Sequence, residues 1–183
     1  MKEYIISLDV ALRKSGLIVL SSEREIVYKN TLVIPKVDLT ESLRLLTDIY
    51  NTEFYKIGEN FPGEKVFVVE DVLGYVSIKT ALGIHAARVA SVISWLNTHP
   101  SHDKVYYYTP NEVKHHFANK RGAKKDELLA GLSARFPKYD YKSLTEDEID
   151  ALALALYHIH SGKDKKDNAE KKPVRKTQRK QRS

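Results

Sequence analysis

The sequence predicts an α/β fold in which a mixed five-stranded sheet is flanked by helices. The chain begins with three β-prone segments. Its middle alternates between strand, helix and strand patterns, and its last part is helical. With 183 residues, 42% of them hydrophobic, the chain is long enough for one domain with its own core and short for two. We therefore expect one domain with the element order βββαβαβααα.

The N-terminal segments predict a β-hairpin and a third strand. Residues 3–10 are rich in Ile and Tyr, and after a polar turn at 13–16 an apolar run resumes at 17–20, which is a hairpin signal. Residues 26–34 are again β-prone and end at Pro35. Three strands should therefore precede the first helix.

The middle of the chain predicts two parallel strands joined by a helix. Apolar residues recur at helical spacing within 39–55, which predicts the first helix. Residues 65–70 form a continuous apolar run ending on a carboxylate, as in a strand covered on both faces. A small-residue-rich helix at 78–96 and a strand at 105–108 follow, and a connection of this length makes the two strands parallel.

Three further helices are predicted from their capping residues. Thr109 caps a helix that begins with Pro110 and runs to about Phe117, and a second helix covers about 124–135. The last helix starts at Thr145, which forms a capping box with Glu148 three residues later.

Composition excludes several classes of protein. The chain has no cysteine, so a disulfide framework, a thiolate nucleophile and a zinc site built on Cys are excluded, whereas His and carboxylate metal sites remain open. It has no Walker A motif, which argues against a P-loop ATPase. Its apolar runs are far shorter than the roughly 20 residues of a membrane helix, and it begins with a charged Lys-Glu pair. We expect a soluble cytoplasmic protein that makes no membrane contact.

The positive charge is concentrated at the C-terminus. Residues 161–183 carry ten Lys or Arg and three acids, whereas residues 1–160 carry 20 basic and 21 acidic side chains. Such a polar segment cannot bury enough apolar surface to fold. We expect a domain at 1–160 and a disordered basic tail at 161–183 that holds nucleic acid, the alternative being a tail that only aids solubility.

Four acids fall at positions where a fold of this class could gather them. Asp9 ends the first strand, Glu70 ends the fourth, and Asp147 and Asp150 lie three residues apart on one face of the final helix. Clustered carboxylates repel one another unless cations neutralise them, and Mg²⁺ prefers oxygen ligands. Two ions about 3.5–4 Å apart would activate a water and stabilise the leaving oxygen of a phosphodiester.

Three of the four acids also have a structural explanation. Asp147 and Asp150 would complement the dipole of their helix, and Asp9 would form an Asx turn. Glu70 is harder to explain in this way, because an unpaired charge next to a buried strand is expensive.

The combination of motifs resembles one known family. The similar segments are, in order, 6–9 with 15–16, 69–72, 110–114 with 123–125, and 147–153. They resemble the motifs of the RuvC-type Holliday junction resolvases, which belong to the RNase H-like superfamily, and the resemblance covers about residues 3–160. The D-x-x-D-A-x-A pattern that starts at Asp147 is the most specific match.

The resemblance implies an RNase H-like fold and a set of site residues. The metal ligands and catalytic acids would be Asp9, Glu70, Asp147 and Asp150, holding two Mg²⁺ ions that Mn²⁺ could replace. Lys114 and Lys125 would lie near the DNA backbone and the scissile phosphate, and Lys125 would stabilise the charge that develops there.

A dense basic patch precedes the final helix. It consists of Lys114, Lys120, Arg121, Lys124 and Lys125, and it predicts salt-dependent DNA binding, the alternative being a solvated helix face. In the loop after the fourth strand, Leu73 or Tyr75 would stack on or wedge an unpaired base, or would instead close the core.

The resemblance also implies a homodimer, because two active sites facing two strands of a four-way junction require two-fold symmetry. The helix at 78–96 would form the dimer contact, with core packing as the alternative use of its small residues. A helicase partner is not predictable from one sequence.

The chain departs from the family at several positions. Ser7 stands where the family usually has Gly, Val10-Ala11 replaces Pro-Gly, and Lys120-Arg121-Gly122 replaces Gly-x-Gly. Together with the basic tail, these changes look more like the viral branch, whose members act in infected host cells.

The sequence therefore predicts a Mg²⁺-dependent, structure-selective endonuclease that resolves Holliday junctions and related branched DNA by two-metal hydrolysis. Two alternatives remain: a YqgF-like RNA-processing nuclease, and a catalytically silent nucleic-acid-binding protein in which the acids are structural.

Overall fold

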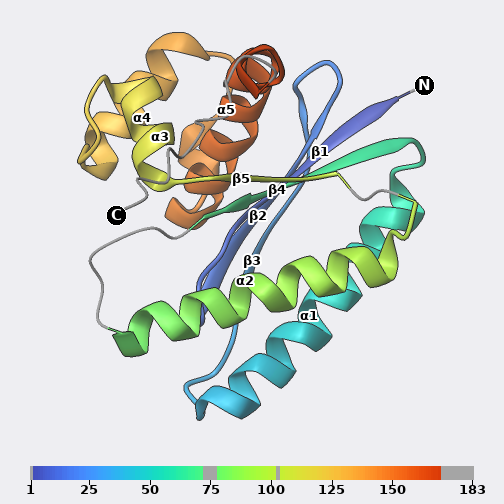
Figure 1. The fold of residues 1–183 in the computed structure, drawn as a ribbon. Coiled ribbons are helices and arrows are strands. Elements are labelled where there is room, and N and C mark those ends of the chain that lie inside the picture. The colour runs from blue at the N-terminus through green and yellow to red at the C-terminus, as the bar shows by residue number, and fades with distance from the viewer. Residues whose placement is uncertain (1, 72–77, 102–103, 170–183) are drawn as a thin grey trace, which may run out of the picture.

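The computed structural model describes residues 2–71, 78–101 and 104–169, which form a single mixed sheet with helices on both faces (Figure 1). The strands are β1 (Glu3–Asp9), β2 (Lys14–Ser21), β3 (Ile26–Val33), β4 (Glu64–Glu70) and β5 (Val105–Tyr108). Their order across the sheet is β3-β2-β1-β4-β5. Strand β2 is antiparallel to both β1 and β3, whereas β4 is parallel to both β1 and β5. The predicted hairpin, parallel strands and mixed five-stranded sheet are confirmed. The turn lies earlier than predicted, because Lys14, Ser15 and Gly16 belong to β2 and Gly16 pairs with Asp9.

Two helical layers cover the sheet. The helices are α1 (Leu39–Asn60), α2 (Ile78–Thr98), α3 (Pro110–Ala118), α4 (Lys125–Arg135) and α5 (Glu146–Ala169), with a 3₁₀ turn η1 at Tyr141–Ser143. Helices α1 and α2 lie on one face of the sheet, and α5 lies on the other with α3 and α4 beside it (Figure 1). The predicted element order is therefore also confirmed.

Alternating side chains of the strands supply the two halves of the core. Along β2, Leu17 and Val19 are buried with α1 and α2, whereas Ile18 and Leu20 are buried with α5. Strands covered on both faces read as continuous apolar runs, which explains the sequence of β2 and β4. In the first half of the core, Trp95 of α2 stacks against Phe67 of β4.

Helix α5 approaches the sheet closely because its buried face is rich in alanine. All residues from Ala151 to Leu156 are buried, and every second one is Ala. A direct bond reinforces this contact: Ser7 of β1 donates a hydrogen bond from its buried Oγ to the carbonyl oxygen of Ala151, at 2.6 Å. Ser7 thus joins helix α5 to strand β1.

Helices α1 and α5 extend well past their predicted ends. Helix α1 continues past residue 55 to Asn60, because Ile57 is still buried in the core. Helix α5 extends to Ala169 and so passes the domain boundary expected at residue 160, while 170–183 lie outside the described residues. Among the helices described, none has the length and hydrophobicity needed to cross a membrane.

Candidate active site

The ends of the two central strands bring Asp9 and Glu70 together. Because β1 and β4 are parallel and Leu8 pairs with Val69, the next residue of each strand emerges at the same edge of the sheet. The two carboxyl groups share a hydrogen bond. Burial raises the pKa of both groups, and for Asp9 the bond to Glu70 and the charges of Glu70 and Asp147 raise the pKa further.

Gly16 allows α5 to reach this edge. It is the partner of Asp9 in the β1–β2 ladder, and a Cβ atom built on it would clash with the backbone carbonyl of Asp147. Glycine is therefore required here by close approach of backbone to backbone. Because Gly16 has no side chain, the backbone of Asp147 can lie against β2, next to Asp9.

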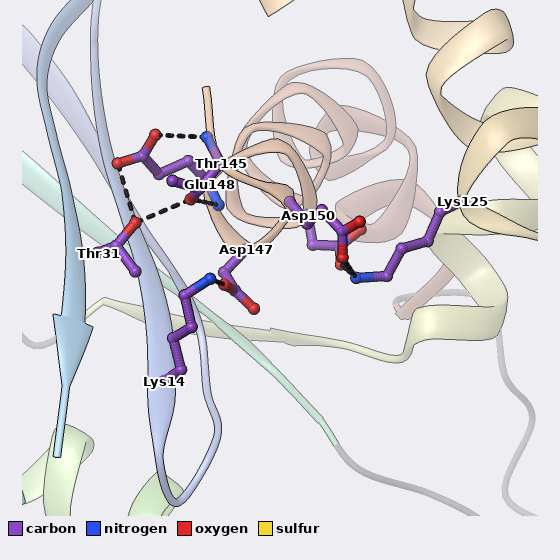
Figure 2. Close-up of polar contacts among 8 residues, drawn as sticks. Lys14, Thr31, Lys125, Thr145, Asp147, Glu148 and Asp150 are labelled. Carbon is purple, nitrogen blue, oxygen red and sulfur yellow. Dashed lines mark hydrogen bonds and ion pairs between the residues drawn. The ribbon is translucent and has the colours of Figure 1, made fainter. Parts of the chain in front are cut away.

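The N-terminus of α5 is held in place by a polar network with β3 (Figure 2). The predicted capping box is present: Thr145 N–H donates to Glu148 Oε2 at 2.9 Å, and Glu148 N–H donates to Thr145 Oγ1 at 3.3 Å. Thr31 of β3 lies 2.8 Å from the Thr145 hydroxyl and donates to Glu148 Oε1 at 3.1 Å. Glu148 thus fixes the helix end, while the acids on either side of it remain for the site.

Asp147 and Asp150 each face a lysine, and the two lysines come from different elements (Figure 2). Lys14 of β2 places its Nζ 2.6 Å from Asp147 Oδ2. Lys125 of α4 places its Nζ 2.7 Å from Glu146 Oε2 and 3.8 Å from Asp150 Oδ2. Burial and the charge of Asp9 raise the pKa of Asp150 to about 6, although Lys125 and Lys114 act in the opposite direction.

The four predicted acids therefore form one electrostatic cluster. Asp9 interacts with Glu70 and Asp147, and Asp150 interacts with Asp9 and Glu70. Three of the four have raised pKa values, chiefly because burial disfavours the charged carboxylate and secondly because other acids of the cluster lie near.

The cluster fits a divalent cation by its chemistry. Its donors are all carboxylate oxygens, the ligands that Mg²⁺ prefers, and two of them, Asp9 and Asp150, lie near each other in a buried setting. Within the described residues, no three Asp, Glu or His side chains are already oriented as a metal site. Asp9 is instead paired with Glu70, and Asp147 with Lys14.

The predicted basic patch divides into two groups. Lys114 lines a pocket of about 170 Å³ together with Glu70 and Asp150, and the Lys125 Nζ lies 3.8 Å from Asp150 Oδ2. Lys120, Arg121 and Lys124 are exposed and lie farther along the chain between α3 and α4.

The outer group is partly neutralised by Glu127. This residue accepts a hydrogen bond from Lys120 Nζ at 2.8 Å and one from the Lys124 backbone N–H at 2.6 Å. Leu73 and Tyr75, which were predicted to contact a base, lie outside the described residues.

The segment after Glu70 is anchored to α2 and β5. Arg88 of α2 forms an ion pair with Asp71, and its guanidinium lies 5.7 Å from the centre of the Tyr107 ring. The Asp71 N–H also donates to the Tyr108 carbonyl at 2.8 Å. These contacts hold the end of β4 and therefore the position of Glu70.

Sequence reasoning did not identify Lys14 as part of the site. It lies two residues before Gly16, so both project from the same face of β2. The two-residue spacing from Gly16 could have identified Lys14 as a site residue, but only once the packing of α5 against Gly16 is known.

Comparison with known proteins agrees with this arrangement. Residues 5–158 match the family model described as crossover junction endodeoxyribonuclease RuvC. No curated protein matches the chain by sequence.

Solved structures with a similar fold are also found. RuvC of Thermus thermophilus in complex with a Holliday junction substrate superimposes with a TM-score of 0.69 at 18% identity, covering 88% of this chain and 96% of that chain. A second structure of Thermus thermophilus RuvC gives 0.68 at 19% identity, with the same coverage. The yeast mitochondrial Holliday junction resolvase Ydc2 gives 0.56 at 10% identity, covering 82% of this chain and 75% of that chain.

Proposed function

The chain belongs to the RuvC family of crossover junction endodeoxyribonucleases, and from this membership we propose that it resolves four-way DNA junctions and related branched DNA by Mg²⁺-dependent phosphodiester hydrolysis. One observation carries the proposal. Four acids from β1, β4 and α5 gather at one edge of the sheet, with Lys114 and Lys125 beside them.

In this proposal the acids hold the metal and the lysines hold the DNA. Asp9, Glu70, Asp147 and Asp150 would hold two Mg²⁺ ions, which would supply an activated water and neutralise charge at the leaving oxygen. Lys114 and Lys125 orient the scissile phosphate, and Lys125 stabilises the negative charge that develops on it. Cleavage leaves 5′-phosphate and 3′-hydroxyl ends.

The proposed enzyme acts as a homodimer through α2. Four apolar side chains on this helix are between 42% and 60% exposed, namely Leu82, Val89, Ile93 and Leu96. Their spacing puts them on one face of the helix, and an exposed apolar stripe of this kind marks a protein interface. A second copy of the chain is the partner that fits, because an isologous contact directs two active sites to two strands of one junction.

The basic segment beyond α5 is also assigned to DNA in this proposal. Residues 170–183 hold seven Lys or Arg and one acid. A polycation of this kind binds phosphates without regard to sequence and so increases affinity for all DNA.

The direct test is cleavage of a labelled four-way junction in Mg²⁺ and in EDTA. The wild type should produce paired nicks only with Mg²⁺, whereas Asp9→Asn and Glu70→Gln should bind the junction and leave it intact. Glu59→Gln, which changes an exposed acid of α1, serves as the matched control and should cleave normally.

Three results separate the candidates. Cleavage that needs Asp9 supports the resolvase. Junction binding with no cleavage under any divalent ion would instead identify a silent DNA-binding protein, and cleavage restricted to structured RNA would identify an RNA-processing nuclease.

A further inference from the structure

Lys14 is an additional cation at the acid cluster, on the side opposite Lys125 (Figure 2). Its Nζ lies 2.6 Å from Asp147 Oδ2, and its side chain is 49% exposed while that of Asp147 is 20% exposed. The lysine therefore approaches from solvent and covers one oxygen of a proposed metal ligand.

The local structure explains why this lysine reaches the site. Lys14 and Gly16 lie on the same face of β2, because side chains alternate along a strand. Helix α5 rests on Gly16 through the Asp147 backbone, and so Lys14, one pleat nearer the strand end, extends past the helix terminus.

The ion pair and a divalent cation compete for the same oxygen. A cation bound by Asp147 would stand next to the Lys14 ammonium, and two positive charges sharing one carboxylate oxygen repel each other. Lys14 would then need another anion nearby. In a nuclease that anion is a phosphate of the DNA strand lying over the acids.

We propose that Lys14 is an exchangeable counter-ion of the active site, which neutralises Asp147 when no divalent cation is bound and contacts a DNA phosphate when one is. This inference deepens the proposed function and rests on it. Lys14 and Lys125 then hold the strand from opposite sides of the cluster, and metal binding and DNA binding each favour the other.

The first test measures metal affinity without DNA. Free Mn²⁺ is followed by electron paramagnetic resonance in titrations of the wild type, Lys14→Met, Lys14→Arg and Lys36→Met. Removing the competing ammonium should tighten Mn²⁺ binding about three- to fivefold in Lys14→Met, as expected for a half-exposed ion pair. Lys14→Arg retains the charge and should resemble the wild type. Lys36→Met removes the charge of an exposed lysine between β3 and α1 and should have no effect.

The second test measures junction binding in Ca²⁺ at several salt concentrations. Loss of one phosphate contact should reduce the slope of log affinity against log salt by about 0.9 in Lys14→Met. Lys14→Arg and Lys36→Met should keep the wild-type slope.

The inference fails if Lys14→Met binds Mn²⁺ no more tightly than the wild type, or if its salt slope is unchanged. A lower unfolding temperature with unchanged Mn²⁺ affinity would show that the ion pair only joins α5 to β2. Neither readout requires cleavage, so these outcomes remain distinct from failure of the proposed function, which would appear as an uncut junction or as no Mn²⁺ binding by the wild type.

Discussion

Asp150 shows how burial prepares a single residue for a cation. Its pKa of about 6 lies above the 3.8 of an unperturbed Asp, chiefly because the side chain is buried and secondly because Asp9 is near. The folded protein therefore binds this proton more tightly than the unfolded chain does. Ionising Asp150 costs folding free energy, and a bound divalent cation would recover it.

The sign of this effect gives a pH prediction in EDTA. Because folding raises the pKa of Asp150, the free-energy cost of ionising it in the folded protein is absent below about pH 4. This cost grows as pH rises towards 6 and is complete above pH 6. Asp150→Asn removes it and should raise the free energy of unfolding by about 1–3 kcal/mol at pH 8. Urea unfolding at pH 4 and pH 8 measures the difference.

The control for this measurement is Asp126→Asn, which changes an exposed acid in the first turn of α4. It should not stabilise the protein at pH 8. If Asp150→Asn destabilised the protein at pH 8 in EDTA, the carboxylate would be favourably paired rather than short of positive charge.

At the scale of elements, the contact between β2 and α5 decides whether the acids meet. Gly16→Ala places a methyl group against the Asp147 carbonyl, so α5 must shift. We expect a loss of about 1–3 kcal/mol of stability from overpacking. Junction cleavage should fall about 100-fold, since a displacement of about 1 Å at a catalytic group has effects of this size.

Gly122→Ala is the matched control, because a Cβ atom built there meets nothing within 4 Å among the described residues. Chemical denaturation and cleavage under single-turnover conditions check both variants. A Gly16→Ala protein with wild-type stability and activity would show that α5 does not depend on this close approach.

The elements also show what local patterns can and cannot predict. The capping box at Thr145 and the apolar runs of β1 and β4 are local, so the helix start and the positions of Asp9 and Glu70 followed from the sequence. The continuation of α5 beyond residue 160 did not, because its polar composition resembles that of a disordered tail. Lys14 was missed because its role depends on α5, which is far away in the sequence.

At the scale of the whole molecule, the acid cluster and the exposed apolar stripe involve helices on opposite faces of the sheet. Helix α5 covers one face of the sheet, and α2 lies on the other (Figure 1). The acid cluster lies at the N-terminus of α5, whereas the apolar stripe of α2 is exposed. In the proposed enzyme, one domain would thus use separate surfaces for cleavage and for contact with a second copy of the chain. The active site should remain folded when the dimer is broken.

This separation yields a prediction about paired cleavage. Ile93→Glu introduces a charge into the stripe, where the side chain is 50% exposed in one copy, and burying that charge in an apolar contact is costly. Analytical ultracentrifugation should find a dimer for the wild type and a monomer for Ile93→Glu, with an unchanged circular dichroism spectrum. Tyr55→Glu, at an exposed apolar position of α1, should remain dimeric.

The monomer should still nick a junction, but its two cuts should occur independently, so that singly nicked junctions accumulate on supercoiled cruciform DNA. An Ile93→Glu protein that stays dimeric would place the interface elsewhere, because the dimer would then not depend on the stripe.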